Sequence, residues 1–505
     1  MITLTLIAPA LTAFLLVLIP KGEGHDRAVR YTALFGSVAA LGFSCALLTR
    51  FDPEHPGFQP TLTESHDWIS ALDISISYRV SVDGISIFMV ILTALLTPIA
   101  VLCSWRSISF RVREFHVALL LLETGMLGVF VATDFVLFYV FWEVTLIPMY
   151  LLIGIWGSKD RIRAAVKFFL YTVAGSFFMF LAMVYLYYHL SKHGVTSFAL
   201  EDVYAGLREH PLDSGPQLWC FLAFALSFAI KVPLFPFHTW LPDAHTEAPT
   251  AGSVILAGVL LKMGTYGFVR FAIPFFPEAA GTLAPYLCVL SIVGIIFGAF
   301  MCLTQTDIKR LIAYSSVSHL GFITLGIFVY TERGLTGGLY QMINHGISTG
   351  ALFLLVGAIY ERRHTRHIED YGGIAAVAPR LATLFFITTL SSIGLPFLNG
   401  FVGEFLILQG TFENDDQGLL YTVFAGTGVV LGAVYMLRLY RSVFLGKITD
   451  EENETMTDLD LRELGYMVPL VALMVILGLF SPWFTERMAP TVQYWFELTQ
   501  LGTSG

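Results

Sequence analysis

The chain has 505 residues, of which 56% are hydrophobic and only 13% are charged, and its formal net charge at pH 7 is −9. Soluble domains usually carry about 25% charged residues, so this composition excludes a disordered chain and an ordinary soluble enzyme. The acidic balance also excludes the basic surface that nucleic-acid binding requires. A chain this apolar is typical of a polytopic helical membrane protein.

Apolar segments long enough to cross a bilayer recur along the whole chain. A hydrocarbon core of about 30 Å needs about 20 apolar residues per helix. The sequence therefore predicts an all-α, polytopic membrane protein with about 14 transmembrane helices. The predicted spans are 2–19, 31–49, 85–105, 115–131, 134–156, 166–190, 217–241, 251–273, 283–304, 308–330, 335–360, 379–410, 419–445 and 464–485.

The basic residues between these spans indicate the orientation, because loops on the cytoplasmic side are rich in Lys and Arg. When residues within five positions of a span end are counted with the adjoining loop, 19 of the 29 Lys and Arg residues lie in odd-numbered loops, 7 in even-numbered loops or at the C-terminus, and three deep within spans. The bias predicts that both termini lie outside, on the face of the membrane opposite the basic loops. Because the first span has no basic region before it, we do not expect a cleaved signal peptide.

The hydrophilic segments are too short to fold as separate domains. The longest, 51–84, contains the alternating stretch Ile74–Tyr78 and predicts a short hairpin on the outer surface. Five cysteines without a CxxC pair, and the absence of phosphate-binding glycine motifs, predict no metal and no cofactor in this chain. The spacing in His238–Glu247 matches no familiar zinc pattern, and we interpret this segment as a connecting loop.

Ionisable residues interrupt several of the predicted spans, and each costs about 2.5–3.5 kcal/mol on insertion scales. Four lie too deep to reach the headgroups easily, and we predict that they are functional: Glu143, Lys231, Lys262 and Glu404. Three others are weaker candidates, because a single polar side chain is often simply hydrogen-bonded within a bundle: Glu123, His319 and His345. The structural alternatives are snorkelling to the headgroups and ordinary ion pairs.

The seventh predicted span has a proline-rich break beside Lys231. Pro233 and Pro236 lack an N–H, so we expect the carbonyls of Ala229 and Val232 to be free to accept from water or protein.

The twelfth predicted span has a similar break, in which Gly394 and Pro396 precede Glu404. Interrupted helices in both halves of a chain indicate an inverted-repeat transporter whose site lies near mid-membrane. The alternative interpretation is that proline merely kinks each helix. It accounts for one such break better than for two breaks that each lie beside a charge.

Polar side chains share a helix face with the buried charges. Gln341, His345 and Ser348 have i, i+4 and i+7 spacing. Burial disfavours a charged lysine and a nearby carboxylate favours it, while histidine suits proton relay because its unperturbed pKa is about 6.5. Such groups fit a proton better than a hard cation, which prefers an oxygen cage. A sodium site built from carbonyls at the breaks stays an alternative.

These residues carry a resemblance to a known family. The segment Lys231–Val254, continuing to Lys262–Gly267, resembles the core of the antiporter-like membrane subunits of respiratory complex I, NADH:quinone oxidoreductase. Phe141–Glu143, followed by Pro148–Tyr150, resembles the fifth helix of that family, and the resemblance extends over about residues 85–505.

Within this family the chain is most similar to the M-type subunits. Glu404 stands where the L and N types typically have lysine, and the chain stops soon after the last span without a long lateral helix. The segment Tyr78–Ser86 before the third span is also similar to the M type.

The resemblance implies a domain plan with two inverted five-helix repeats, in which helices 7 and 12 are broken. Residues 1–114 would hold the first three helices and the outer loop 51–84. Residues 115–273 would form the first repeat, residues 283–445 the second, and residues 446–505 the last helix and a short tail.

The resemblance also assigns roles to residues of this chain. Glu143 would pair with Lys231 and tune its proton affinity, Lys262 would be the central relay, and Glu404 would pass the proton outwards. Residues on or near the connecting axis, at lower weight, would be His238, His319, His345 and Glu123.

The implied function is proton translocation in the membrane arm of NADH:quinone oxidoreductase, driven by redox energy from other subunits. The chain would carry no redox centre, and FMN, iron–sulfur clusters, NADH and quinone would be bound by partner subunits. The expected partners are other complex I subunits, especially the L and N types, and membrane lipids. The expected location is a bacterial inner membrane, in preference to a mitochondrial one, with both termini on the periplasmic side.

Three other functions remain compatible with the sequence. A subunit of a multisubunit Na⁺/H⁺ antiporter or of a membrane-bound hydrogenase would keep the fold and change the reaction. A stand-alone solute transporter would need a solute-binding constellation, of which the sequence gives no sign beyond the ionisable axis. A purely structural subunit would retain these charges without using them.

Overall fold

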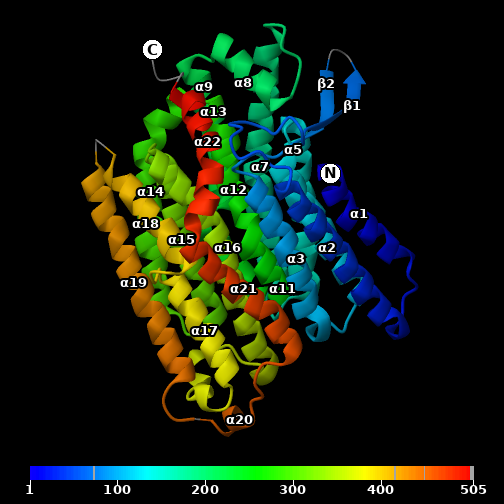
Figure 1. The fold of residues 1–505 in the computed structure, drawn as a ribbon, viewed down its shortest axis with the longest axis vertical. Coiled ribbons are helices and arrows are strands. Elements are labelled where there is room, and N and C mark those ends of the chain that lie inside the picture. Colours follow the sequence, from blue (N-terminus) through cyan, green and yellow to red (C-terminus); the bar gives the residue numbers. More distant parts are fainter. Residues whose placement is uncertain (72–73, 415–416, 449, 501–505) are drawn as a thin grey trace.

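The computed structural model describes residues 1–71, 74–414, 417–448 and 450–500. Long helices lie side by side and form one bundle, with a small β-hairpin at one end (Figure 1). In the described residues, 11 helical segments are long and apolar enough to cross a membrane. The predicted spans at 2–19, 217–241 and 379–410 are also helical, the first a shorter helix and the other two each divided by a break. The predicted all-α, polytopic class is confirmed.

The N-terminal part contributes three long helices and the hairpin. Its elements are α1 (Ile2–Leu18), η1 (Glu23–His25), α2 (Asp26–Leu48), β1 (Glu64–Ala71), β2 (Ile74–Val80) and α3 (Ile87–Ser107). Strands β1 and β2 pair antiparallel, which confirms the predicted hairpin, while the turn at 72–73 lies outside the described residues.

The next part contains the first broken helix. Its elements are α4 (Val112–Val131), α5 (Phe135–Val144), α6 (Leu146–Trp156), α7 (Arg161–Ser191), α8 (Leu200–Glu209), α9 (Ser214–Lys231), η2 (Phe237–Thr239), α10 (Trp240–Glu247), α11 (Thr250–Ile255), η3 (Leu256–Leu260), α12 (Leu261–Gly267), η4 (Phe268–Ala272) and α13 (Ile273–Phe275). The segment 238–247 that we interpreted as a loop is therefore mainly helical.

Helix α9 ends at Lys231, and the chain resumes helical structure only after Pro236. The carbonyl of Ala229, which Pro233 leaves without its usual helical donor, accepts from the N–H of Leu234 at 2.7 Å, so the protein itself satisfies it. The carbonyl of Ile230 accepts from the indole N–H of Trp240 at 2.8 Å, so helix α10 packs back onto the break. The break thus exposes fewer acceptors to water than the prolines alone suggested.

The second half contains the other broken helix. Its elements are α14 (Pro277–Thr304), α15 (Ile308–Phe328), α16 (Glu332–Arg363), η5 (Ile368–Asp370), η6 (Ile374–Ala376), α17 (Pro379–Ser392), α18 (Asn399–Phe412), α19 (Gly418–Phe444), α20 (Glu451–Glu454), α21 (Leu461–Leu479) and α22 (Ser481–Gln500). Between α17 and α18 the backbone turns through Gly394, whose φ of +74° favours glycine.

Helix α22 was not anticipated by the sequence analysis, which predicted one span at 464–485 and a short tail. The last span instead ends at Leu479, and a new helix follows directly with Pro482 in its first turn. Helix α22 packs against α13, α16 and α21 (Figure 1). The indole N–H of Trp495 donates to the carbonyl of Val269 at 2.7 Å, which ties the end of the chain to the first half.

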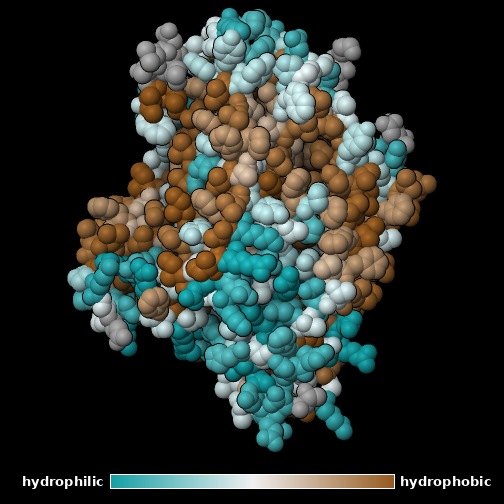
Figure 2. Space-filling model, turned by 180° about the vertical axis from the view of Figure 1, so that it is seen from behind, coloured by the Kyte–Doolittle hydropathy of each residue, from teal (hydrophilic) through white to brown (hydrophobic). Residues whose placement is uncertain are grey.

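The core lies around three central segments, Thr250–Phe275, α15 and α16, whose apolar spans are buried throughout. Helices α1, α7 and α19 lie at the periphery and expose large apolar side chains such as Phe14, Phe177 and Val430. On the face shown in Figure 2, apolar residues cover much of the middle and upper part of the molecule, and hydrophilic residues gather at the top and over the lower end. The polar side chains of the central helices are therefore shielded from lipid by the outer ones.

Candidate functional site

Lys262 is the centre of the buried polar groups. It lies on α12 between two π-helical turns, η3 and η4. Its side chain is fully buried, and its Nζ donates to the carbonyl of Ala257 and lies 2.6 Å from Nδ1 of His345. Insertions of this π type widen a helix locally and occur frequently at functional sites. Here the carbonyl of Ala257, which lies in η3, accepts from the ammonium of the lysine.

His345 begins a line of titratable side chains that crosses the second half. The rings of His345 and His319 have centroids 5.7 Å apart. Nδ1 of His319 lies 2.9 Å from Oε1 of Glu404, and the amide of Gln341 donates to the same oxygen at 3.3 Å. Lys262, His345, His319 and Glu404 therefore lie in sequence from α12 through α16 and α15 to α18.

Amide and hydroxyl groups support this line where the two halves of the broken helix meet. The hydroxyls of Ser348 and Ser391 lie 2.7 Å apart, and Ser391 donates to Oδ1 of Asn399 at 2.5 Å. Asn344 donates to the carbonyl of Asn399 at 2.8 Å. Sequence analysis missed Asn399 and Ser391, although both flank the break at Gly394 and Pro396.

A small cavity of about 10 Å³ lies beside His319 and His345, lined by these amides and hydroxyls. One water molecule needs about 10–15 Å³ of such space and two to four polar partners. This cavity is thus of the size and polarity that one water fills.

The arrangement around Lys231 is different. Its Nζ is buried and has no hydrogen-bond partner among the described residues. It lies 5.1 Å from the ring centroid of Trp142 and 5.8 Å from that of Phe168. Glu143 is only partly buried, its Oε1 has no partner, and no ion pair within 4.0 Å joins it to Lys231 in the described chain.

Two lower-weight candidates lie off the line. Glu123 is fully buried on α4 beside Thr97 of α3. The ring of His238 contacts those of Phe235 and Phe297, with centroid distances of 5.4 and 5.1 Å. Among the hydrogen bonds of the described residues, none joins Glu123 or His238 to Lys262, His345, His319 or Glu404.

His245 is a further buried titratable group that sequence analysis did not single out. Its ring stacks on Phe353 at 4.6 Å, and neither ring nitrogen has a partner in the described part of the chain. It lies near enough to both Lys309 and Lys262 to interact with their charges. Its position seven residues after His238 is two helical turns, which would place both histidines on one helix face. The interpretation of this segment as a loop left that spacing without meaning.

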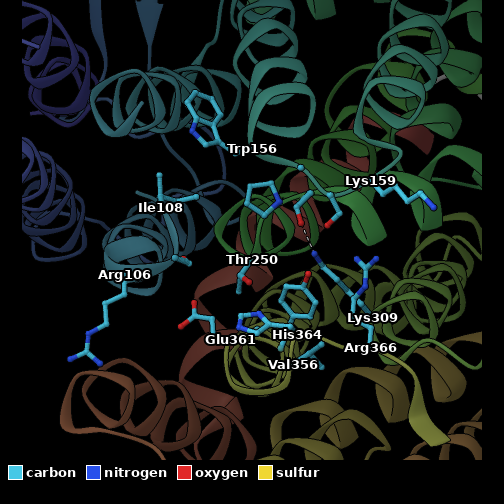
Figure 3. Close-up of a pocket in the computed structure, with 17 residues that line it drawn as sticks. Arg106, Ile108, Trp156, Lys159, Thr250, Lys309, Val356, Glu361, His364 and Arg366 are labelled. Atoms are coloured by element: carbon cyan, nitrogen blue, oxygen red, sulfur yellow. Dashed lines mark hydrogen bonds between the residues drawn. The ribbon is translucent and has the colours of Figure 1, made fainter. Parts of the chain in front are cut away.

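A cavity of about 800 Å³ lies at the end of the bundle that carries Lys309 (Figure 3). Figure 3 shows Trp156 and Ile108 on one side and Lys309, Arg366 and His364 on the other. Lys309 donates to the carbonyl of Ala248, the hydrogen bond drawn in that view. The residues that line this cavity lie at helix ends and in the odd-numbered loops, which are rich in Lys and Arg.

The opposite end of α12 is closed by a buried ion pair. Arg270, near the end of the predicted span 251–273, lies in η4 and donates to Oδ2 of Asp83 at 2.5 Å. Its Nε donates to the hydroxyl of Tyr266 at 3.1 Å, and its carbonyl accepts from Tyr204 at 2.6 Å. Tyr204 lies on α8, outside the spans, and burial raises the pKa of its hydroxyl, so it remains a donor.

Comparison with known proteins agrees with this architecture. The family of NADH:quinone oxidoreductase and Mrp antiporter transmembrane subunits matches residues 132–432. The chain is 45% identical to NADH-quinone oxidoreductase subunit M of Rhodobacter capsulatus over 492 residues, which cover 96% of this chain and 94% of that protein. It is 40% identical to NADH-ubiquinone oxidoreductase chain 4 of Arabidopsis thaliana, with 96% and 95% of the two chains covered.

Solved structures show the same relationship. A chain of respiratory complex I from Thermus thermophilus superposes with a TM-score of 0.87 at 32% identity, covering 99% of this chain and 100% of that one. A chain of the Mrp complex from a Dietzia species shares the fold, with a TM-score of 0.82 at 20% identity and 99% and 98% of the chains covered. The chain belongs to the family of NADH:quinone oxidoreductase and Mrp antiporter membrane subunits, and within it to the M-type subunits of complex I.

Proposed function

We propose that this chain translocates protons in the membrane arm of NADH:quinone oxidoreductase, along the buried line from Lys262 through His345 and His319 to Glu404. The observation that carries the proposal is the 2.6 Å contact between Nζ of Lys262 and Nδ1 of His345. A lysine and a histidine at this distance share one proton between two bases. In a structural role, a buried lysine would instead be expected to meet a carboxylate.

Each group in the line has a chemical role. Lys262 holds a proton and passes it to Nδ1 of His345, because an imidazole can accept a proton at one nitrogen and donate one from the other. Transfer from His345 to His319 crosses the small cavity, where one water bridges the rings. His319 then delivers the proton to the Glu404 carboxylate at 2.9 Å.

In the first half of the chain, Lys231 and Glu143 would determine when Lys262 takes up a proton. We propose that Lys231 alternates between pairing with Glu143 and separating from it, and that the separated arrangement is the one described above. A charge moved in a low-dielectric interior changes the proton affinity of its neighbours. Each proton moved against about 200 mV costs about 4.6 kcal/mol, so this alternation must be driven from outside the chain.

The driving energy would come from redox chemistry in partner subunits. NADH, FMN, iron–sulfur clusters and quinone would be bound there, and this chain would carry no redox centre. Its neighbours would be the L- and N-type subunits, which carry the change along the membrane arm as a shift between two states.

The orientation follows from the loop charges. The Lys- and Arg-rich end would face the bacterial cytoplasm, and both termini the periplasm. The cavity at Lys309 then opens to the cytoplasm and would supply protons towards His245 and Lys262. Glu404 would release them towards the periplasm.

A second candidate is a subunit of a Na⁺/H⁺ antiporter with the same fold, which the likeness to an Mrp complex favours. Purification separates the two proposals. Association with flavin and iron–sulfur subunits supports the oxidoreductase, and sodium-dependent proton exchange without them supports the antiporter.

The proposal is tested by replacing Lys262 with Ala in the assembled complex, in inverted membrane vesicles. Quinone reduction by NADH and vesicle acidification are measured together, and native electrophoresis checks assembly. We expect assembly to persist and acidification per NADH to fall. Lys192→Ala, at the exposed outer end of α7, is the control and should pump normally. Full pumping by an assembled Lys262→Ala variant would falsify the proposed path.

A further inference from the structure

We propose that Trp142 and Phe168 form an aromatic seat that holds the ammonium group of Lys231 when this lysine is separated from Glu143. The inference rests on the proposed function, in which Lys231 alternates between two arrangements. It adds two residues that position the lysine in one of them.

The geometry of the seat places two ring faces near the ammonium. Nζ of Lys231 lies 5.1 Å from the centroid of Trp142 and 5.8 Å from that of Phe168. Both distances lie within the roughly 6 Å over which a cation is attracted to an aromatic face. Trp142 and Phe168 come from different helices, α5 and α7, so the lysine at the end of α9 lies between them.

The two rings are the groups near Nζ that can stabilise its charge. In the described chain Nζ has neither a hydrogen-bond partner nor a carboxylate within 4.0 Å. Lys231 is only 1% exposed, so bulk water does not solvate it. The negative face of an aromatic ring attracts a cation without accepting its proton. The seat therefore stabilises the charged lysine without taking the proton that Lys231 carries.

The rings are held rigidly by other aromatic side chains. Trp142 contacts Phe228 with a centroid distance of 5.5 Å, and Phe168 contacts Trp240 at 5.4 Å. Trp240 in turn donates to the carbonyl of Ile230, the residue before Lys231. The break in α9 is thus fastened to the same aromatic cluster that faces the ammonium.

The two alternatives for Lys231 are adjacent in the sequence, because Trp142 is followed directly by Glu143. On a helix, consecutive residues point about 100° apart, so a long lysine side chain can exchange one for the other by changing its rotamers. The ring face gives Lys231 a defined second position, where otherwise a buried ammonium would have no partner. The relative stability of Lys231 at the seat and at the Glu143 carboxylate then sets how long the Lys231–Glu143 pair stays separated.

The test weakens the ring face without changing its shape. Tryptophan with one, two or four fluorines is incorporated at position 142 of the assembled complex, and proton pumping per NADH is measured in inverted vesicles. Fluorine withdraws electron density and reduces the attraction to a cation. We expect pumping to fall stepwise with each added fluorine, by about tenfold in total. The same series at Trp219 on α9, whose side chain is 71% exposed, should leave pumping unchanged.

Two substitutions accompany the series. Trp142→Phe keeps a ring face and should retain most of the pumping, whereas Trp142→Leu should lose about as much as the tetrafluorinated ring. A flat fluorine series, or equal activity of the Phe and Leu variants, would overturn the seat.

Failure of the seat and failure of the proposed function are distinguishable with one more variant. If Lys231→Ala abolishes pumping while the fluorine series is flat, Lys231 acts without the aromatic seat. If Lys231→Ala pumps normally, the proposed role of Lys231 is itself wrong, and the seat with it.

Discussion

Nζ of Lys262 lies 2.6 Å from Nδ1 of His345, and no carboxylate in the described residues lies within 4.0 Å of this lysine. At such a contact one nitrogen donates and the other accepts, so one hydrogen lies between the two bases. A buried lysine that is stabilised only by a histidine and a carbonyl is costly to keep for structure alone. The contact is chemically suited to handing over a proton.

Replacing His345 with Gln should separate hydrogen bonding from proton carriage. Glutamine can still accept from Lys262 through its amide oxygen, but it cannot take up the proton. We expect assembly to be retained and pumping per NADH to fall by about tenfold or more, because general acid–base groups contribute about 10²–10⁴-fold in transfer steps. Vesicle acidification with NADH and quinone provides the measurement.

His116→Gln is the matched control for this variant. His116 is also a fully buried histidine in a membrane span, but its Nδ1 lies 2.7 Å from the carbonyl of Val112 on its own helix. It should pump normally. Equal loss in both variants would mean that buried histidines matter here for packing, and not for transfer.

Glu404→Gln should block the line at its other end. Oε1 of Glu404 accepts from His319 at 2.9 Å and from Gln341 at 3.3 Å, and a glutamine of the same size can preserve both contacts. It cannot, however, carry a proton. We expect acidification to be lost and thermal stability to change by less than about 1 kcal/mol.

The control is Glu413→Gln, which removes one partner of a partly exposed ion pair with Arg333. Pumping should be unaffected there, since exposed pairs contribute little. Normal acidification by Glu404→Gln would remove Glu404 from the path and leave the line to end at His319.

The buried titratable residues could be predicted from the sequence because their cost in lipid does not depend on the details of packing. Lys262 and Glu404 interrupt apolar segments, and any fold that buries those segments must bury the charges. His345 and Gln341 share one face at helical spacing, so their common orientation was also predictable.

The contacts between these residues depend on tertiary structure and could not be predicted in the same way. The interruption of the helix around Lys262 by π turns has no clear sequence signal, yet the carbonyl that the lysine binds lies in one of these turns. Asn399 meets Ser348 only because the halves of the broken helix overlap beside α16. The predicted span 251–273 gave no sign of a partner for Arg270, whereas the structure pairs it with Asp83, 187 residues earlier, in the core.

Asp83→Asn tests whether that distant pair stabilises the bundle. Asparagine cannot neutralise the guanidinium of Arg270, which is buried and would be left with an unpaired charge. Breaking one side of a buried pair costs about 3–5 kcal/mol. We expect a lower midpoint of thermal unfolding for the detergent-solubilised complex, measured by loss of the assembled band after heating.

Arg333→Gln serves as the comparison, because its partner Glu413 and Arg333 itself are both substantially exposed. That substitution should change stability by less than about 1 kcal/mol. If Asp83→Asn were no more destabilising than Arg333→Gln, the pair at Asp83 would not contribute to the closure of this end of α12.

Gly400→Ala tests how closely the two halves of the broken helix must pack for the line to form. Gly400 lies in the first turn of α18, and a methyl group there would overlap the carbonyl oxygen of Ser391 at the end of α17. Backbone cannot move aside as a flexible side chain can, and overpacking of this kind costs about 1–3 kcal/mol. Because Ser391 donates to Asn399 beside the cavity at His319, a displaced α17 should also disturb proton transfer. We therefore expect lower thermal stability together with reduced acidification.

Gly426→Ala, on the outer helix α19 with open space around the added methyl, should change neither quantity. Unimpaired pumping and stability in Gly400→Ala would mean that the overlap of the half-helices is not needed for the path.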